Sequence, residues 1–193
     1  LSPRGWRFAS RHRHHITYIE ADLVDMAKYK HNLLQAGGLN SDHHHVRIIN
    51  ALADTGADSL AEIAAKLDPS KGLAIITEGL VNYFDTATVQ QMWARFAQVL
   101  SGFQHGLYLS DLHIKATNRG PATRTFMSLL STFVGGRVHL HFKDTGSAEV
   151  ALSQAGFSQG VLLKPSEFRD QLPDCRATGV DVVRVVCART THP

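Results

Sequence analysis

The most constraining feature of this sequence is a short apolar run, Gly72 to Thr77, that ends on an acidic residue and a glycine. The run contains β-branched residues, which favours a strand buried on both faces of a parallel sheet. Glu78 and Gly79 follow it. Because open α/β sheets bind ligands outside the carboxyl ends of their strands, Glu78 is a candidate ligand contact. The alternative is a solvated glutamate in a turn.

A second acidic pair, Glu20 and Asp22, follows another expected strand, Ile16 to Ala21. Because the two acids alternate along an extended chain, their side chains point the same way. A carboxylate at such a strand end accepts hydrogen bonds from both hydroxyls of a ribose. One acid could then hold the sugar while the other orients the preceding loop. Alternatively, both are acids at the start of a helix, favoured there by the helix dipole.

Strands and helices alternate along most of the chain, which favours a parallel sheet covered on both faces. The remaining expected strands in this part are Val46 to Ala51 and Gly106 to Leu112. The expected helices are Leu23 to Ala36, Asp58 to Leu67, a segment from Thr86 or Thr88 to Leu100, Ala122 to Phe133, and Ala148 to Ala155. In the first of them, Leu23, Met26, Ala27, Leu33 and Leu34 lie roughly on one side.

The C-terminal end breaks this alternation. Its two expected strands, Gly160 to Leu163 and Val180 to Ala188, enclose the loop Gln171 to Gly179, which has no room for a persuasive helix. Consecutive strands without a crossover helix pair antiparallel. A mostly parallel sheet with a C-terminal antiparallel hairpin is the arrangement of the Rossmann-like class I methyltransferases, and we therefore expect this α/β fold. An arbitrary mixed sheet is the alternative.

Composition favours one globular domain in a reducing cytoplasm. The chain has 193 residues, of which 44% are hydrophobic and 19% charged, as in soluble globular proteins. Its 2 cysteines give no disulfide framework. No apolar run approaches the roughly 20 residues of a membrane helix. Basic residues are scattered apart from Arg4, Arg7, Arg11 and Arg13 near the start, so nucleic-acid binding is not indicated.

Histidines form two runs, which raises the question of a metal site. One comprises His12, His14 and His15, and the other is His43 to His45. Consecutive histidines in a loop point in different directions and do not match the tetrahedral spacing that zinc requires. His139 and His141 alternate on a segment that could be extended, which is a somewhat better geometry. We expect no metal site.

Several segments resemble the leucine carboxyl methyltransferase family, and within it the bacterial polyketide O-methyltransferases related to the tetracenomycin carboxyl methyltransferase. The resemblance is carried by Tyr18 to Leu23 with Tyr29-Lys30, and by Thr77 to Phe84. Leu1 to Phe8 is similar to the end of that family's first cofactor motif. There Arg4 matches the family's arginine, and Ser2 replaces its usual aspartate.

The resemblance implies an S-adenosylmethionine-dependent O-methyltransferase acting on a small-molecule carboxyl or hydroxyl group, such as that of a polyketide. It implies that Asp22 binds the ribose hydroxyls and that Glu78 lies at the methionine end of the cofactor. Asn50 and Ala51 stand at the adenine position, where the family usually has an aspartate. From the residues alone, Asn50 with Ala51 or Leu52 could contact an adenine, or Asp54 could. The alternative is that Asn50 and Asp54 are loop residues with local backbone hydrogen bonds.

Methyl transfer to a carboxylate needs no general base, so we expect no catalytic triad. Tyr83 could line the methyl-donor pocket, and a buried position in the core is the alternative. Ser110, with Asp111 beside it, and His113 stand at the end of an expected strand and are candidates for the acceptor side. The sequence is compatible with a homo-oligomer.

The family places a helical region, a first strand and a glycine-containing cofactor loop ahead of the position of Leu1. We therefore expect residues 1–193 to be a single methyltransferase domain that lacks its N-terminal part. A rival hypothesis is a non-catalytic remnant or a subunit that depends on a partner. A third, a protein of the nucleotide- or NAD-binding α/β class, predicts a Gly-x-Gly-x-x-Gly turn, which does not occur in this sequence.

Overall fold

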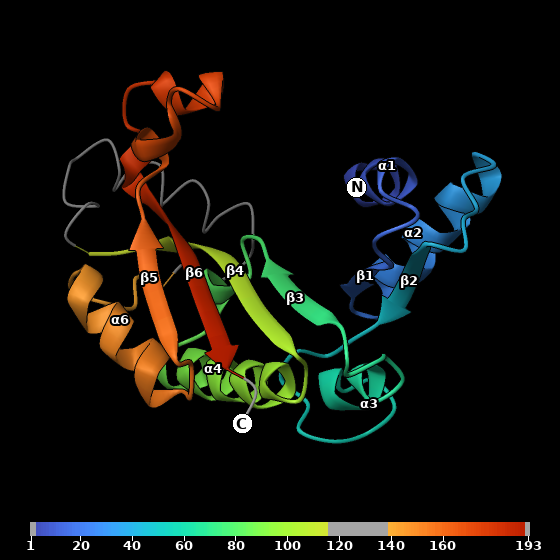
Figure 1. Cartoon of the computed structure of the whole chain (residues 1–193), viewed down its shortest axis with the longest axis horizontal. Helices are drawn as coiled ribbons and strands as arrows, with labels where there is room; N and C mark the ends of the chain where they lie inside the picture. Colours follow the sequence, from blue (N-terminus) through green and yellow to red (C-terminus); the bar gives the residue numbers. More distant parts are fainter. Residues whose placement is uncertain (1–2, 116–138, 192–193) are drawn as a thin grey trace. The chain divides into compact units, whose positions relative to one another are not determined.

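The computed structural model describes residues 3–115 and 139–191 (Figure 1). The chain divides into two compact units, Leu1–Lys66 and Leu67–Pro193, and each is described by itself. The expected helix from Ala122 to Phe133 lies outside the described residues. No helix in the described ranges combines the length and the apolar character needed to cross a membrane.

The first unit contains a two-stranded parallel sheet with helices beside it. Its elements are α1 (Arg4–Arg11), β1 (Tyr18–Asp22), α2 (Val24–Ala36), β2 (His44–Ile48) and α3 (Leu60–Ala64). Strand β1 pairs with β2, with Tyr18 opposite His44 and Asp22 opposite Ile48. The alternation predicted from the sequence is confirmed here, although β2 begins and ends earlier than expected and α3 is shorter.

Helix α1 was not predicted from the sequence, where the same residues matched a glycine-containing turn. Gly5 lies inside this helix, and α1 packs against β1. A Cβ atom on Gly5 would collide with the Glu20 carboxylate and the Tyr18 ring. The absence of a side chain at this position therefore permits the close approach of helix and strand.

Helix α2 buries less of its apolar side than the sequence pattern predicts. Ala27 and Leu34 are buried, as expected. Leu23, Met26 and Leu33, which the sequence places on the same side, are exposed. Helix α2 contacts both β1 and β2, and a two-stranded sheet offers it only a narrow surface.

The second unit contains a four-stranded mixed sheet. Its helices and strands are β3 (Gly72–Thr77), α4 (Thr86–Ser101), β4 (His105–His113), α6 (Thr145–Gln154), β5 (Gln159–Leu163) and β6 (Val183–Thr191). Short 3₁₀ turns are η1 (Val81–Tyr83), η2 (Pro165–Phe168), η3 (Pro173–Arg176) and η4 (Val180–Val182).

The strand order β3-β4-β6-β5 confirms the predicted C-terminal hairpin. Strands β3 and β4 are parallel, whereas β6 lies between β4 and β5 and is antiparallel to both. It follows that β3, β4 and β5 run in the same direction and end at one edge of the sheet, as Figure 1 shows. This carboxyl edge is where ligands bind in related open sheets.

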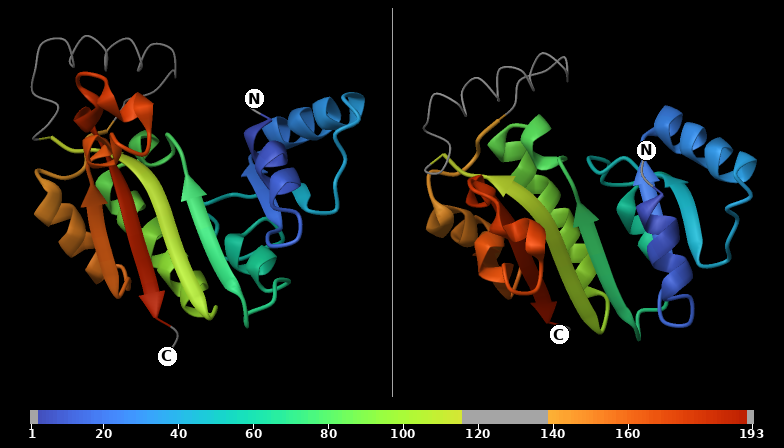
Figure 2. Two further views of the ribbon diagram at one scale, coloured as in Figure 1. Left: turned by 45° about the horizontal axis from the view of Figure 1, so that its top comes forward. Right: turned by 90° about the horizontal axis from the view of Figure 1, so that it is seen from above.

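An aromatic core joins this sheet to the helices on one of its faces. The Trp93 ring stacks on Phe142, with centroids 5.3 Å apart, and Tyr108 lies between Phe96 and Phe157 at 5.3 and 5.8 Å. Helices α4 and α6 contact each other, and Figure 2 shows them on the same side of the sheet. Aromatic pairs of this kind contribute about 0.5–1.5 kcal/mol each beyond their burial.

The prediction that Gly72 to Thr77 is buried on both faces is wrong for this unit. Thr77 is buried and Ile75 partly so, but Ala74 is exposed and the Ile76 side chain is 52% exposed. The exposed residues alternate with the more buried ones and so share one face of β3, whereas α4 and α6 lie together on one side of the sheet. Strand β3 is also the outermost strand of its sheet and pairs with β4 alone among the described strands. The cap of α4 also differs from expectation, since Asp85 rather than Thr86 or Thr88 caps it.

Candidate functional site

In the second unit, the candidate site lies at the carboxyl ends of β3 and β4. Glu78 and Gly79 follow β3, and Asp111 lies near the end of β4. Gly79 has a φ of 64°, in the left-handed region that favours glycine, and its N–H donates to Asp111 Oδ1 at 2.7 Å. The bend after β3 is therefore tied to the neighbouring strand, and the exposed Glu78 is presented at this edge.

Below this edge, a buried group of hydroxyls holds the two strands together. Thr77 Oγ1 lies 2.9 Å from the Tyr108 hydroxyl and donates to Ser110 Oγ at 2.9 Å. The Trp93 indole donates to the same Tyr108 hydroxyl at 3.2 Å. Ser110, predicted for the acceptor side, is buried and bonded in this network. Its hydroxyl acts within the protein.

Hydrogen bonds from the described segment that begins at His139 hold the turn η1 in place. The His139 N–H donates to the Asn82 carbonyl at 2.8 Å, and Asn82 Nδ2 donates to the His139 carbonyl at 2.7 Å. His141 Nε2 donates to the Val81 carbonyl at 2.8 Å. These three bonds keep η1, with its exposed last residue Tyr83, at the sheet edge.

Tyr83 has a 48% exposed side chain, so the alternative that it belongs to the buried core is wrong. His113, the last residue of β4, is half-buried. It alternates with Leu112, which is fully buried, and so lies on the opposite face of the strand. Acceptor contacts by Tyr83 and His113 remain predictions.

His141 is a buried titratable group in this region, with only 6% of its surface exposed. Its Nδ1 lies 3.3 Å from Thr86 Oγ1. Burial lowers the pKa of His141, although the bond to the Val81 carbonyl opposes the shift. The ring is therefore neutral at pH 7, with its proton on Nε2 and Nδ1 as the acceptor. The sequence showed only an alternating histidine pair and gave no sign of this role.

In the first unit, the two acids predicted for the ribose lie in different surroundings. The Glu20 carboxylate pairs with Lys30 of α2, and His44 Nε2 of β2 lies 3.6 Å from Glu20 Oε1. Asp22, at the end of β1, is exposed, and its Oδ1 accepts the N–H of Leu23 at 2.8 Å. Asp22 therefore offers a solvent-facing carboxylate, whereas Glu20 is engaged by two cationic or polar side chains.

The residues predicted for the adenine lie after β2 rather than in it. Asn50 Oδ1 accepts the N–H of Leu52 at 3.0 Å, and the Asn50 carbonyl accepts from Ala53 at 3.0 Å. The alternative of local backbone hydrogen bonds is thus confirmed for Asn50. Arg4 is exposed at the first turn of α1. The roles of Arg4, Asn50 and Ala51 toward the cofactor stay predictions.

The histidine runs do not gather into a ligand set in the described structure. The rings of His139 and His141 are nearly parallel, with centroids 6.2 Å apart. Across residues 3–115 and 139–191, no three His, Cys, Asp or Glu side chains are placed to hold one metal ion.

Comparisons with known proteins identify the fold. No protein-family model matches the chain, and no curated protein sequence matches it. Among solved structures, an O-methyltransferase family protein from Burkholderia thailandensis aligns with a TM-score of 0.61 and 14% identity, over 97% of this chain and 47% of its own. The chain has the class I methyltransferase fold.

Two further solved methyltransferase structures align with the chain. Magnesium protoporphyrin IX methyltransferase from Synechocystis, solved with bound S-adenosylhomocysteine, aligns with a TM-score of 0.51 and 12% identity, over 91% of this chain and 64% of its own. Human N-acetylserotonin methyltransferase, solved with S-adenosylmethionine, aligns with a TM-score of 0.55 and 11% identity, over 91% of this chain and 41% of its own. The chain thus spans between about two fifths and two thirds of the length of these enzymes.

Proposed function

We propose that this chain is the cofactor-binding part of an S-adenosylmethionine-dependent O-methyltransferase. The observation that carries the proposal is the acidic strand end of β1, where exposed Asp22 stands in a class I methyltransferase fold. Structures of this fold have been determined with S-adenosylmethionine and with S-adenosylhomocysteine. The acceptor is a carboxyl or hydroxyl oxygen of a small molecule such as a polyketide, as the leucine carboxyl methyltransferase resemblance implies.

The groups that the chain presents at the ends of β1 and β3 fit the chemistry of this cofactor. The bond from Leu23 occupies Asp22 Oδ1, and no described residue donates to Oδ2. A carboxylate oxygen of this kind accepts well from ribose hydroxyls. At the end of β3, a Cβ built on Gly79 would meet nothing within 4 Å, so the backbone there is open to a ligand. Exposed Glu78 precedes it and supplies a negative charge toward a cationic methionine end.

The side chains of this protein have little covalent chemistry to perform. When bound, the cofactor supplies an activated methyl group and its own leaving group. Asp22 and Glu78 then serve to orient it, and Tyr83 shields one side of the reacting centre from water. An ionised acceptor oxygen needs only alignment with the methyl group, so no residue is required to remove a proton.

The experiment that tests the site is calorimetric titration of the protein with S-adenosylhomocysteine. Asp22→Ala and Glu78→Ala should each weaken binding at least about tenfold, because each removes a charge-assisted contact worth about 1.5–3 kcal/mol. Asp25→Ala and Glu62→Ala remove exposed acids of α2 and α3 and serve as matched controls. If both Asp22→Ala and Glu78→Ala bind as tightly as the parent, the site assignment is wrong.

A second candidate function is a partner-dependent or non-catalytic methyltransferase subunit. It is favoured by the strand edges, since β1 pairs with β2 alone and β3 with β4 alone among the described strands. Unpaired edges of apolar parallel strands are sites of further strand pairing. Tight S-adenosylhomocysteine binding with no methyl transfer to a panel of aromatic acids and phenols would support this candidate. Transfer by the purified chain would exclude it.

A further inference from the structure

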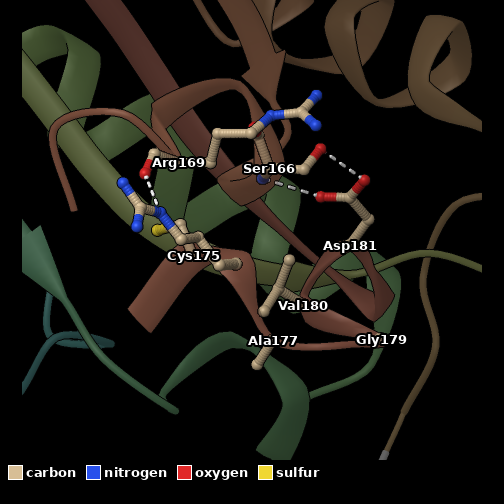
Figure 3. Close-up of a pocket in the computed structure, with 8 residues that line it drawn as sticks. Ser166, Arg169, Cys175, Ala177, Gly179, Val180 and Asp181 are labelled. Carbon is tan, nitrogen blue, oxygen red and sulfur yellow. Dashed lines mark hydrogen bonds between the residues drawn. The ribbon is translucent and has the colours of Figure 1, made fainter. Parts of the chain in front are cut away.

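The connection between β5 and β6 encloses a pocket that the proposed cofactor site does not use. Its volume is about 310 Å³, and Arg176 is among its lining residues. Figure 3 labels three others, Ser166, Arg169 and Asp181. The connection begins where β5 ends, at the edge of the sheet where β3 and β4 also end. Within the second unit, the pocket therefore belongs to the ligand-binding edge of the sheet.

Both arginines of this pocket are held in place through one nitrogen only. Arg169 Nε donates to the Ser166 carbonyl at 3.1 Å, and Arg176 Nε donates to the Arg169 carbonyl at 2.9 Å. No described residue accepts a hydrogen bond from the terminal nitrogens of either guanidinium. Because each Nε is anchored to the backbone, the two forks are ordered in advance and their Nη donors remain for a ligand.

The single carboxylate that lines the pocket is already engaged. Asp181 accepts from the Ser166 N–H at 3.0 Å and from the Ser166 hydroxyl at 2.7 Å. Those bonds, with a smaller effect of the Arg184 charge, lower the pKa of Asp181, so it is ionised at pH 7. Arg184 is itself buried and bonded to the Asp181 carbonyl. Arg184 bonds the backbone of Asp181, so its positive charge lies near the Asp181 carboxylate and partly compensates it.

Arg169 and Arg176 have no such compensation. Glu167, Asp170 and Asp174 lie in the same connection, but no carboxylate in the described ranges is within ion-pair distance of either guanidinium. A guanidinium presents its positive charge on a rigid, planar fork of N–H donors. A pocket lined by two uncompensated, pre-ordered guanidinium groups is suited to an anion with planar or tetrahedral oxygens.

We propose that Arg169 and Arg176 bind an anionic group, a carboxylate or a phosphate, carried by the methyl acceptor. That an anion binds here is argued from the pocket alone. That the methyl acceptor carries this anion rests on the proposed methyltransferase function. The proposal gives the enzyme an acidic acceptor class and places the recognition of its charge on the β5–β6 connection.

The test is a titration of ¹⁵N-labelled protein with inorganic phosphate and, separately, with succinate, followed through the arginine Nε–H signals. The signals of Arg169 and Arg176 should shift with saturation, and the stronger response should identify phosphate or carboxylate as the preferred group. Arg169→Gln and Arg176→Gln should each raise the dissociation constant at least about fivefold. Arg189→Gln, an exposed arginine at the far end of β6, is the matched control and should leave it unchanged.

Two further measurements keep the outcomes separate. Arg169→Lys retains the charge but not the anchored fork, so it should bind the anion with intermediate affinity if the pocket recognises geometry as well as charge. Arg169→Gln should bind S-adenosylhomocysteine with the same affinity as the parent. A loss of this affinity would indicate that the variant is unfolded or that the cofactor assignment is wrong. Equal anion affinities in Arg169→Gln, Arg176→Gln and Arg189→Gln would overturn the proposal.

Discussion

At the scale of single residues, the hydroxyl of Tyr108 organises the interior of the second unit. It accepts from the Trp93 indole and shares a hydrogen bond with Thr77, and all three side chains are buried. Burial raises the pKa of Tyr108 above its ordinary value, so the phenol stays protonated. Buried polar groups that lose their only partner carry the full cost of desolvation.

We therefore predict that Tyr108→Phe lowers the free energy of unfolding by about 1–3 kcal/mol, because it leaves the Trp93 N–H without an acceptor. Urea denaturation followed by fluorescence measures the change. Phe96→Leu alters the adjacent ring without touching the hydrogen bonds, and it should show only a packing loss. A Tyr108→Phe protein as stable as the parent would contradict this account of the network.

A pH dependence follows from His141. Its pKa in the folded state is lowered by burial, so below the unfolded-state value of about 6.5 the unfolded chain binds a proton that the folded chain does not. The neutral ring thus contributes stability above that pH, and this contribution is lost as the pH falls through the folded pKa. One such proton contributes a slope of at most about 1.4 kcal/mol per pH unit.

The groups that face this ring in the folded state are Asp85, Lys115 and His139. We predict that His141→Gln, whose amide can still donate to the Val81 carbonyl, flattens the fall in stability between pH 7 and pH 5. Urea denaturation in a Trp6→Phe background reports the second unit through Trp93. The exposed His14→Gln is the control. An unchanged slope in His141→Gln would rule out this ring as the source.

At the scale of elements, glycines in the strands set how closely the helices pack. A Cβ on Gly106 of β4 would collide with the Thr190 hydroxyl of β6 and would lie 2.8 Å from the Leu100 Cβ and carbonyl of α4. A Cβ on Gly160 of β5 would lie 2.9 Å from Leu152 of α6. Contacts this short require backbone or side-chain shifts. Each helix therefore rests on a strand position that tolerates no side chain.

We predict that Gly106→Ala destabilises the second unit by about 1–3 kcal/mol, the usual cost of overpacking. Gly102→Ala is the control, because its added Cβ would meet the Val99 carbonyl at an ordinary 3.4 Å and its φ of −75° suits any residue. Thermal melts of the two variants give the comparison. If Gly106→Ala melts with the parent, α4 does not depend on this close contact.

At the scale of the whole molecule, cofactor binding should stabilise the folded chain. A ligand that binds only the folded state adds about 2.7 kcal/mol at a concentration of 100 times its Kd. S-adenosylhomocysteine should therefore raise the melting temperature in a concentration-dependent way, and Asp22→Ala should reduce the rise. ATP, which carries the adenosine but not the sulfur-containing end, is the control ligand. An equal rise with ATP would favour the nucleotide-binding hypothesis.

The alternation of strands and helices along the chain, and the antiparallel hairpin at the C-terminus, followed from local pattern. The run from Gly72 to Thr77 forms a strand at the predicted bounds, and the lack of a helix between the last two strands did determine their antiparallel pairing. These features depend on hydrophobic periodicity and on connection length, which residues close together in the sequence determine. The α1 helix was missed because its glycine, which pattern assigns to a turn, is required by packing against β1.

By itself, the sequence determined the fold class and the residues that end the strands, because alternation and breakers act over a few positions. Only the tertiary structure decided which of those residues face solvent. Asp22 is exposed while Glu20 is paired with Lys30, Ser110 is buried beneath the edge, and β3 is an outer strand. Such outcomes depend on partners distant in the chain. The same holds for the arginines of the β5–β6 connection, because the Asp181 carboxylate that lines their pocket is bonded to Ser166 and pairs with neither guanidinium.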